Sequence, residues 1–204
     1  MKLTGERVIP KLMAGDNGLL IEHVKRYEFA SRFVSGRVLD IACGTGYGTQ
    51  ILLECDGTGE IKQIIGVDLD KDTIDYAKEN YNNEKVSYII DDAASTDLAA
   101  KLGSFDTIVS FETLEHLEKD ISFLNNLEKL LKPSGTLIIS TPFGRGRGIP
   151  CSNPYHVHQY TEEEFVQLLN IFDNVELYYQ RNETIEKPVA GKKYYLMIAV
   201  CSKV

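Results

Sequence analysis

The sequence predicts an α/β protein built on a doubly wound, mostly parallel sheet. Five short apolar runs alternate with helical patterns between residues 37 and 140. The runs are nearly continuous in apolar character, which is typical of parallel strands buried on both faces. A glycine-rich turn follows the first of them. Strand–helix alternation of this kind gives a sheet covered by helices on both faces, with right-handed crossovers.

The elements follow in chain order. Leu20, Val24 and Tyr27 lie at helical spacing, and this pattern predicts a first helix over residues 19–34. The predicted parallel strands span residues 37–42, 63–68, 86–90, 105–110 and 136–140. Helices are predicted between them at about 47–54, 70–80, 95–102 and 113–131.

The end of the chain has a different pattern. Thr161 and Glu164 form a capping box that opens a helix to about residue 170. Two further strands are predicted at 174–179 and 193–201. About a dozen residues separate them, which is too short for a helical crossover, so they are expected to pair antiparallel. The sheet is therefore expected to be mixed, with one reversed strand at its end.

Composition sets limits on partners and location. The 204 residues suffice for one domain, 1–204, with a substantial core. A net charge of −8 opposes nonspecific nucleic-acid binding. The sequence has no 18-residue apolar run of the kind that indicates a membrane span. The N-terminus lacks the apolar core of a signal peptide. The four cysteines show no CxxC pairing and indicate reduced thiols in a cytoplasmic protein.

The turn after the first strand carries the clearest binding signal. Gly44, Gly46 and Gly48 let the backbone turn tightly and approach a ligand beside a helix N-terminus. Asp68 closes the second strand, twenty residues after Gly48, where a carboxylate accepts hydrogen bonds from ribose hydroxyls. The alternative is a tight strand–helix turn with no ligand. The turn and the acid together favour a nucleotide.

The glycine spacing argues against a dinucleotide. The third glycine comes one residue early, and Thr49 stands where the dinucleotide pattern has glycine. Asp40 lies at the base of the loop. Its carboxylate would repel a pyrophosphate and attract a ligand that carries an ammonium and a sulfonium.

Several segments together resemble the class I S-adenosylmethionine-dependent methyltransferases, of the type 11 and type 23 kind. They are DIACGTGYG (40–48), GVDLD (66–70), DDA (91–93), FDTIVSFETLEHL (105–117) and LKPSGTLIISTP (131–142). The resemblance covers nearly the whole chain. It implies a Rossmann-like sheet of seven strands with the last strand antiparallel, and S-adenosylmethionine as the cofactor.

The resemblance also implies a set of cofactor-binding residues. Asp40 and the Gly44–Gly48 backbone would hold the methionine part, Asp68 the ribose, and Asp92 with Ala93 the adenine. Phe111 would line the methionine end. Ala42 and Leu69, which lie within these motifs, complete the expected set. Asp92 fits the adenine position better than Asp91 because it directly precedes Ala93.

The N-terminus has a narrower similarity. TGERVIP (4–10) followed by EHVKRYEFA (22–30) resembles a bacterial subgroup associated with glycosyltransferases and surface-polysaccharide assembly. This implies that residues 1–35 form a lid loop and helix over the cofactor, with Arg26 or Tyr27 at the cofactor carboxylate. The alternative for Tyr27 is an aromatic side chain of the core.

A cluster of acids and histidines follows the fourth strand. Glu112, Glu115 and His116 share one face if a helix begins near Glu112. A second cluster, with His156 and His158, lies between the fifth strand and the capped helix.

The spacing of these clusters resembles the small-RNA 3′-terminal 2′-O-methyltransferases, in which two Glu and two His hold a divalent metal. Glu112, Glu115, His116 and His156 occupy the corresponding positions. Related ExxEH patterns occur in quinone O-methyltransferases.

Three interpretations of this cluster stay open. A Glu and His set suits Mn, Fe, Co or Zn, and a metal would lower the pKa of an acceptor hydroxyl. Without a metal, His116, His156 or His158 would act as general base. In the third interpretation the acids only favour a helix N-terminus and the histidines bind loop backbone. Separately, Arg145 and Arg147 in a glycine-rich loop suggest a clamp for an acceptor phosphate.

The expected function is methyl transfer from S-adenosylmethionine to a small-molecule acceptor. A sugar or nucleotide-sugar hydroxyl or amine comes first on the N-terminal resemblance, a quinone-like phenol second, and an RNA end third because the chain is acidic. A dehydrogenase is opposed by the glycine spacing. A non-catalytic subunit that binds S-adenosylmethionine is the remaining alternative.

Overall fold

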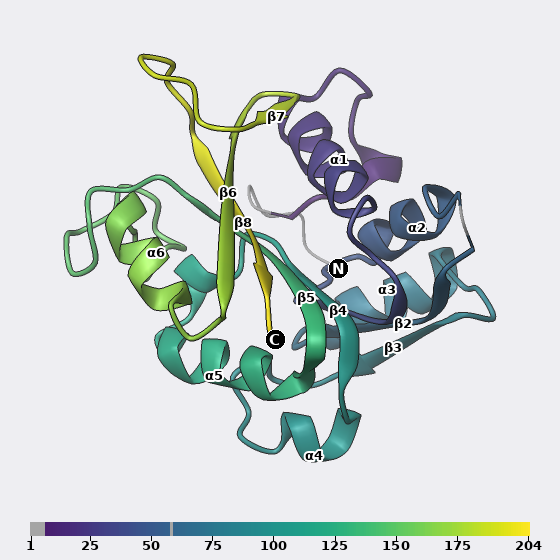
Figure 1. The fold of residues 1–204 in the computed structure, drawn as a ribbon. Coiled ribbons are helices and arrows are strands. Elements are labelled where there is room, and N and C mark those ends of the chain that lie inside the picture. The colour runs from purple at the N-terminus through teal and green to yellow at the C-terminus, as the bar shows by residue number, and fades with distance from the viewer. Residues whose placement is uncertain (1–6, 58) are drawn as a thin grey trace.

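The computed structural model describes residues 7–57 and 59–204, and its centre is one eight-stranded sheet with strand order β3-β2-β1-β4-β5-β8-β6-β7 (Figure 1). The strands are β1 (Gly36–Ile41), β2 (Ile61–Asp68), β3 (Val86–Ile90), β4 (Phe105–Ser110), β5 (Leu131–Pro142), β6 (Asn174–Arg181), β7 (Thr184–Glu186) and β8 (Leu196–Ser202). The α-helices are α1 (Gly18–Ala30), α2 (Tyr47–Glu54), α3 (Lys71–Asn80), α4 (Leu98–Leu102), α5 (Asp120–Leu130) and α6 (Glu162–Leu169). Two short 3-10 helices are η1 (Pro10–Leu12) and η2 (Leu114–His116).

Local sequence signals set several helix starts. The Asn17 side chain caps α1 by accepting from the Leu20 amide, and Asp70 caps α3 by accepting from the Thr73 amide. The capping box predicted at Thr161 is present at the start of α6. Each contact satisfies an amide that the first helical turn leaves without a partner.

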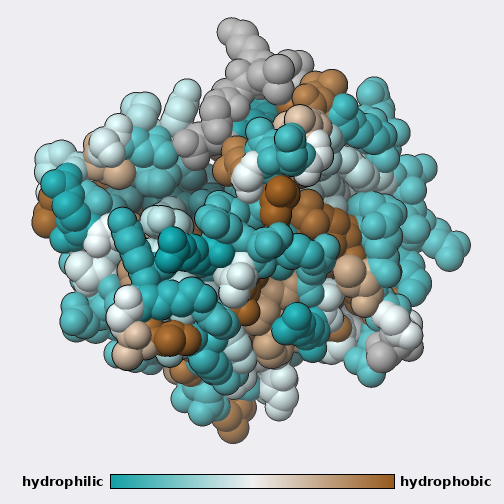
Figure 2. Space-filling view, turned by 90° about the horizontal axis from the view of Figure 1, so that it is seen from above, coloured by the Kyte–Doolittle hydropathy of each residue, from teal (hydrophilic) through white to brown (hydrophobic). Residues whose placement is uncertain are grey.

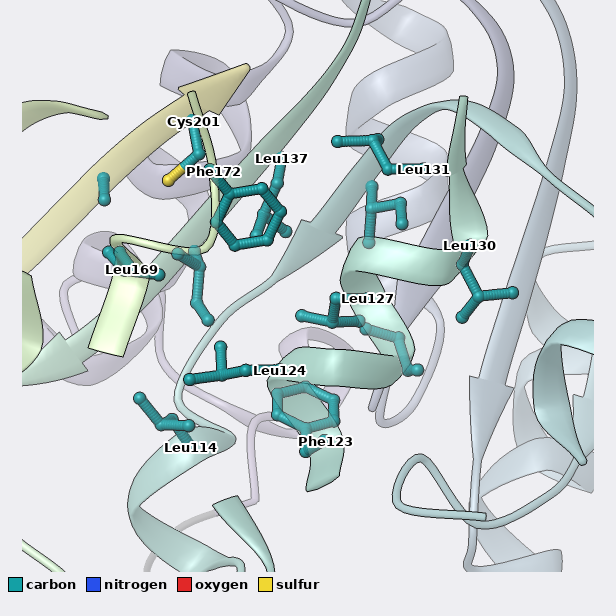
Figure 3. Packing of buried hydrophobic residues seen from close by; sticks show 14 of the residues in the cluster. Leu114, Phe123, Leu124, Leu127, Leu130, Leu131, Leu137, Leu169, Phe172 and Cys201 are labelled. Carbon is teal, nitrogen blue, oxygen red and sulfur yellow. The ribbon is translucent and has the colours of Figure 1, made fainter. Parts of the chain in front are cut away.

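The helices cover both faces of the sheet. Figure 1 shows α1, α2 and α3 on one side and α4, α5 and α6 on the other. Strand β1 shows why, because Leu39 and Ile41 pack into one hydrophobic core while Val38 packs into the other. In the first core, Phe123, Leu124 and other residues of α5 meet residues of β5, β8 and α6 (Figure 3).

The C-terminal part of the sheet differs in two respects from the sequence expectation. The final strand β8 is antiparallel as predicted, but it lies between β5 and β6 instead of at the edge of the sheet. The edge is β7, an eighth strand that the sequence did not predict. It forms because Asn182, at φ 52°, allows a two-residue turn that pairs Arg181 with Thr184.

The helix expected over 113–131 is divided. Glu112 adopts a left-handed conformation with φ 49°, and its amide donates to Oγ of Ser140 at 3.2 Å. The chain then forms η2, leaves helical geometry at Leu117 and resumes as α5. Glu112 therefore precedes the helical turn, and it does not share a helix face with Glu115 and His116.

Residues 1–6, which begin the expected lid and the TGERVIP motif, lie outside the described residues. No helix in the described ranges is long and apolar enough to cross a membrane. In the view from above, hydrophilic residues cover most of the surface and hydrophobic residues form a few groups (Figure 2).

Candidate active site

The glycine-rich turn lies at the carboxyl end of β1. Ala42, Gly44 and Gly46 all have positive φ, at 58°, 54° and 82°, and Gly46 is the residue that caps α2. Positive φ is the conformation that glycine adopts without steric cost. The turn places backbone groups and the start of α2 at the edge of the sheet where open α/β sheets bind ligands.

Asp68, at the end of β2, ties this turn to the next strand. Its Oδ2 accepts from the Gly44 amide at 2.9 Å, and its Oδ1 accepts from the Asp70 amide at 3.0 Å. A carboxylate has about four acceptor positions, so two remain for ligand hydroxyls. The amides fix the orientation of Asp68 before any ligand arrives.

One cavity brings together five residues of the expected cofactor-binding set. Ala42, Asp68, Leu69, Asp92 and Ala93 line a space of about 110 Å³. Leu69 is 69% exposed and offers an apolar surface to a ring.

Both neighbouring acids, Asp91 and Asp92, line this cavity, but their side chains have different partners. Asp91 is held by Lys101 at 2.8 Å. Within the described residues, the side chain of Asp92 accepts one hydrogen bond, from the nearby Ala94 amide. Asp92 is thus the acid more available to an adenine amino group. Thr113 and Leu117 also line the cavity and were not predicted, because a loop carries them there from beyond β4.

A second cavity, of about 130 Å³, lies on the other side of the turn. Tyr27, Ala42, Gly44 and Phe111 line it, all four from the expected cofactor set. We call it the methionine-end cavity. Ala42 lines both cavities, so the two spaces meet at the glycine-rich turn.

Two of the expected glycines have a packing role instead of a ligand-binding one. Gly46 and Gly48 are not among the lining residues of either cavity. A Cβ on Gly48 would lie 2.0 Å from Cζ of Tyr27, and one on Gly46 would lie 2.7 Å from Cβ of Ala77. These glycines allow α1 and α3 to pack closely against the turn.

Asp40 is fully buried beneath α1 and is not among the residues that line either cavity. The Tyr27 hydroxyl donates to its Oδ1 at 3.0 Å, while its Oδ2 has no hydrogen-bond partner within the described chain. Burial raises the pKa of Asp40 to about 7, against the lowering effect of the Tyr27 hydrogen bond, and the charge of Asp68 raises it further. An unsatisfied buried carboxylate oxygen is costly, and a ligand ammonium would relieve that cost.

Arg26, the alternative to Tyr27 for the cofactor carboxylate, is directed elsewhere. It is buried, and its Nη1 donates to Oε1 of Gln180 at 2.7 Å. Its Nη2 lies 3.9 Å from Oε1 of Glu112. Arg26 is not among the residues that line the methionine-end cavity.

Glu115 is the centre of the ExxEH segment. It is buried, and its Oε2 accepts from the Thr141 hydroxyl at 3.0 Å. Its backbone carbonyl accepts from the amides of Val157 and His158 at 2.9 and 3.0 Å. Burial, followed by the neighbouring charge of Glu112, raises the pKa of Glu115 well above its usual range. These contacts hold the loop of residues 150–158 against η2.

Three of the four expected metal ligands come together. Glu115, His116 and His156 each offer one ligand atom, and these atoms lie within 4.8 Å of one another. The two imidazole rings are 5.0 Å apart at 87°. Glu112 is not in this group, because its left-handed backbone directs it to Arg26. We call Glu115, His116 and His156 the EHH group.

The three candidate base histidines occupy different environments. His116 lines the methionine-end cavity, and its Nδ1 is 2.9 Å from the carbonyl oxygen of Tyr155. His156 packs beside it and is 2.9 Å from the Asn153 amide nitrogen through Nε2. His158 lies 6.1 Å from the Tyr160 ring and lines neither cavity.

Sequence reasoning missed His23 and Tyr47. Both line the methionine-end cavity, and His23 Nδ1 is 2.9 Å from the Tyr47 hydroxyl oxygen. Burial, followed by the charge of Arg26, lowers the pKa of His23 well below its usual value, so its ring is uncharged at neutral pH. A signal was present, because His23 and Tyr27 are four residues apart on one helix face.

The two arginines of the glycine-rich loop are bound within the protein. Arg147 contacts the buried carboxylate of Asp120 at 2.8 Å, and Arg145 donates to the Pro150 carbonyl at 2.6 Å. The Tyr160 hydroxyl also donates to Asp120. Arg147 therefore neutralises the buried carboxylate of Asp120. This geometry does not support the predicted clamp for an acceptor phosphate.

Comparison with known proteins shows which proteins this chain is similar to. A family model described as a methyltransferase domain matches residues 39–139. A probable S-adenosylmethionine-dependent methyltransferase of Mycolicibacterium smegmatis is 30% identical over 174 residues, which cover 83% of this chain and 63% of that protein. The chain thus spans less than two thirds of that relative's length.

Two further comparisons are narrower. A ubiquinone biosynthesis O-methyltransferase of Xanthomonas campestris is 31% identical over 106 residues, covering 52% of this chain and 42% of that protein. The solved structure of the N-methyltransferase NodS from Bradyrhizobium japonicum, in complex with S-adenosyl-L-homocysteine, shares the fold with a TM-score of 0.64. It is 20% identical and covers 93% of this chain and 89% of that one. Residues 39–139 therefore form a methyltransferase domain, and the chain is related to the S-adenosylmethionine-dependent methyltransferases.

Proposed function

We propose that this chain transfers the methyl group of S-adenosylmethionine to a hydroxyl of a small molecule. One observation carries the proposal: His116 belongs to the EHH group and also lines the methionine-end cavity. A proton-accepting or metal-binding group thus adjoins the space where the reacting end of the cofactor would lie. An amine acceptor would need no such group, since it only has to arrive uncharged.

The residues present fit the cofactor. Asp68 would hold the ribose, Asp92 the adenine, and the buried Oδ2 of Asp40 offers a negative charge to the ammonium of the methionine part. Phe111 and Tyr27 enclose the methionine end, with their ring centroids 5.1 Å apart. S-adenosylmethionine supplies an activated methyl group, so the protein mainly aligns the acceptor and excludes water.

His116 is placed to handle the acceptor proton. A carbonyl oxygen only accepts, so the contact with Tyr155 requires a proton on Nδ1 of a neutral His116. Its Nε2 then carries a lone pair. That atom can receive the proton that a hydroxyl loses as the methyl group arrives, or it can bind a metal.

The EHH group also fits a divalent metal. One carboxylate and two imidazoles are a donor set for Zn, Mn, Fe or Co, and catalytic zinc sites use three protein ligands with one open position. Oε1 of Glu115 is buried and has no hydrogen-bond partner among the described residues. This atom is therefore available as a ligand for a cation. A bound metal would lower the pKa of an acceptor hydroxyl.

A phenol is the second acceptor class, after the sugar or nucleotide-sugar hydroxyl favoured by the N-terminal resemblance. The observation that favours it is the similarity to a ubiquinone biosynthesis O-methyltransferase over about half of the chain. An RNA end is disfavoured by the net charge of −8.

A screen for transfer of a radiolabelled methyl group tests the proposal. Nucleotide-sugars, phenols and short RNAs would be offered to chelator-treated protein, with and without added Zn²⁺ or Mn²⁺. We expect label in a sugar or phenol product and loss of turnover in His116→Ala. Cofactor binding without label in any acceptor would instead indicate a non-catalytic subunit. If His116→Ala turns over as fast as the unmodified protein, the EHH group takes no part in the reaction.

A further inference from the structure

Two atoms of the EHH group face one another. Oε1 of Glu115 lies 3.9 Å from Nε2 of His116, which is too long for a hydrogen bond. Oε1 is buried and has no hydrogen-bond partner among the described residues. The contact of Nδ1 with the Tyr155 carbonyl leaves the lone pair of a neutral His116 on Nε2. Zn²⁺ binds such atoms at about 2.0–2.2 Å, so one ion can reach both.

The orientation of Glu115 is set by Thr141. Oε2, the other carboxylate oxygen, accepts from the Thr141 hydroxyl at 3.0 Å. Both side chains are buried, Thr141 fully and Glu115 to within 1%. Because the hydroxyl holds one oxygen, the carboxylate cannot turn freely, and the other oxygen stays directed at His116.

The support comes from a strand in the sheet. Thr141 is the residue before the end of β5, and it pairs with Met197 in the ladder that joins β5 to β8. The preceding residue, Ser140, accepts from the Glu112 amide at 3.2 Å. The end of β5 therefore fixes the backbone that enters η2 and also the side chain of Glu115 within η2.

We infer that Thr141 is a positioning residue, which holds Glu115 in the direction that binds a divalent cation such as Zn²⁺ or Mn²⁺. The inference rests on the metal-binding part of the proposed function. Thr141 would not contact the ion itself. Hydrogen-bond partners of metal ligands commonly change metal affinity by about 10- to 100-fold when they are removed. The alternative is that the hydroxyl only satisfies a buried acid.

Two substitutions of Thr141 separate these roles. Thr141→Val keeps the shape of the side chain and removes the donor, whereas Thr141→Ser keeps the donor. In calorimetric titrations of the chelator-treated full chain, Thr141→Val should bind Zn²⁺ and Mn²⁺ at least about tenfold more weakly. Thr141→Ser should bind them within about threefold of the unmodified protein. The visible absorption spectrum of added Co²⁺ should change in Thr141→Val and return in Thr141→Ser.

A matched control and a double variant accompany this test. Thr107 is a buried threonine of β4 whose hydroxyl bonds to the backbone of Ser35 at 3.1 Å. Thr107→Val makes the same chemical change away from the EHH group and should leave metal affinity unchanged. In a Glu115→Gln background, Thr141→Val should cost little further affinity, because the ligand that it positions is gone. Melting curves report whether each variant folds, and Thr141→Ala removes the same donor if Thr141→Val does not fold.

The outcomes are distinct. A lower melting temperature of Thr141→Val with unchanged metal affinity would show that the hydroxyl only satisfies a buried acid, and it would overturn the inference. Equal losses of affinity in Thr141→Ser and Thr141→Val would overturn it as well. If the unmodified protein binds neither metal, the inference fails, whereas metal-free methyl transfer would still support the proposed function. Metal binding as expected, without transfer of label to any acceptor, would count against the proposed function and leave this inference standing.

Discussion

The hydroxyl of Tyr27 donates a 3.0 Å hydrogen bond to Oδ1 of Asp40, and both side chains are buried. The contact joins α1, the expected lid helix, to β1, and it stabilises the charged form of Asp40. Tyr27→Phe keeps the ring against Gly48 and removes only this bond. The pKa of Asp40 should then rise further.

At pH 7 the Tyr27→Phe variant should bind S-adenosyl-L-homocysteine about three- to tenfold more weakly, because less of Asp40 is ionised. Calorimetric titration at pH 7 and pH 8 measures the effect. The deficit should shrink at pH 8. A deficit equal at both pH values would mean that the hydroxyl contacts the ligand instead of tuning Asp40.

Cofactor affinity should depend on pH through Asp40. Its pKa is raised to about 7, chiefly by burial, so the carboxylate is protonated at lower pH and no longer attracts an ammonium. Affinity for S-adenosyl-L-homocysteine should fall as the pH drops from about 7.5 to about 5.5, approaching tenfold per unit at the lower end. Titrations across this range, with Asp40→Asn as the control, check it. A flat profile in the unmodified protein would contradict an ionised Asp40 at the ligand.

The same shift affects stability with a defined sign. The folded-state pKa of Asp40 lies above its unfolded value, so the folded protein binds more protons between about pH 4 and pH 7. The contribution of Asp40 to the free energy of unfolding therefore becomes less favourable as the pH rises through this window. Asp40→Asn should gain stability relative to the unmodified protein between pH 5 and pH 8, as measured by urea unfolding.

Gly48 should resist substitution because of Tyr27. A Cβ there would lie 2.0 Å from Cζ of the ring, so Gly48→Ala must displace α1 or the turn. We expect a loss of about 1–3 kcal/mol in the free energy of unfolding. Gly57→Ala, where no atom lies within 4 Å of the added Cβ, serves as the control. In a Tyr27→Ala background most of the cost should vanish, and a cost unchanged there would exclude this explanation.

The two acids of the ExxEH segment should differ in metal binding. Glu115→Gln should weaken Zn²⁺ or Mn²⁺ binding to chelator-treated protein at least about tenfold, because it removes a ligand of the EHH group. Glu112→Gln should change it little, since that carboxylate lies beside Arg26. Calorimetry with each metal separates the two. Equal losses would restore the four-ligand set that the sequence resemblance implied.

Much of the fold could be predicted because its signals are local. The buried strand β1, the glycines after it and the acid at Asp68 occur within one strand–helix–strand unit, and each has its own physical reason. The helix-capping roles of Asp70 and Thr161 could also be predicted from the local sequence.

The remaining features depend on contacts between distant segments. The break before η2 accompanies contacts of Glu112 with Ser140 and of Glu115 with the 150–158 loop, which no helical periodicity reveals. Strand β7 lacks a glycine turn and relies on Asn182. Arg26 lies on the expected lid helix, and its hydrogen bond to Gln180 of β6 directs it away from the cavity.

Calorimetric titration with S-adenosyl-L-homocysteine tests the central claim most directly, using the unmodified protein and Asp68→Ala. The account predicts one ligand bound per chain, at least about tenfold more weakly in the variant, which lacks the carboxylate for the ribose hydroxyls. NADH should not bind, because the glycine spacing and Asp40 oppose a pyrophosphate. Binding of NADH in preference to S-adenosyl-L-homocysteine, or an unchanged affinity in Asp68→Ala, would contradict the account.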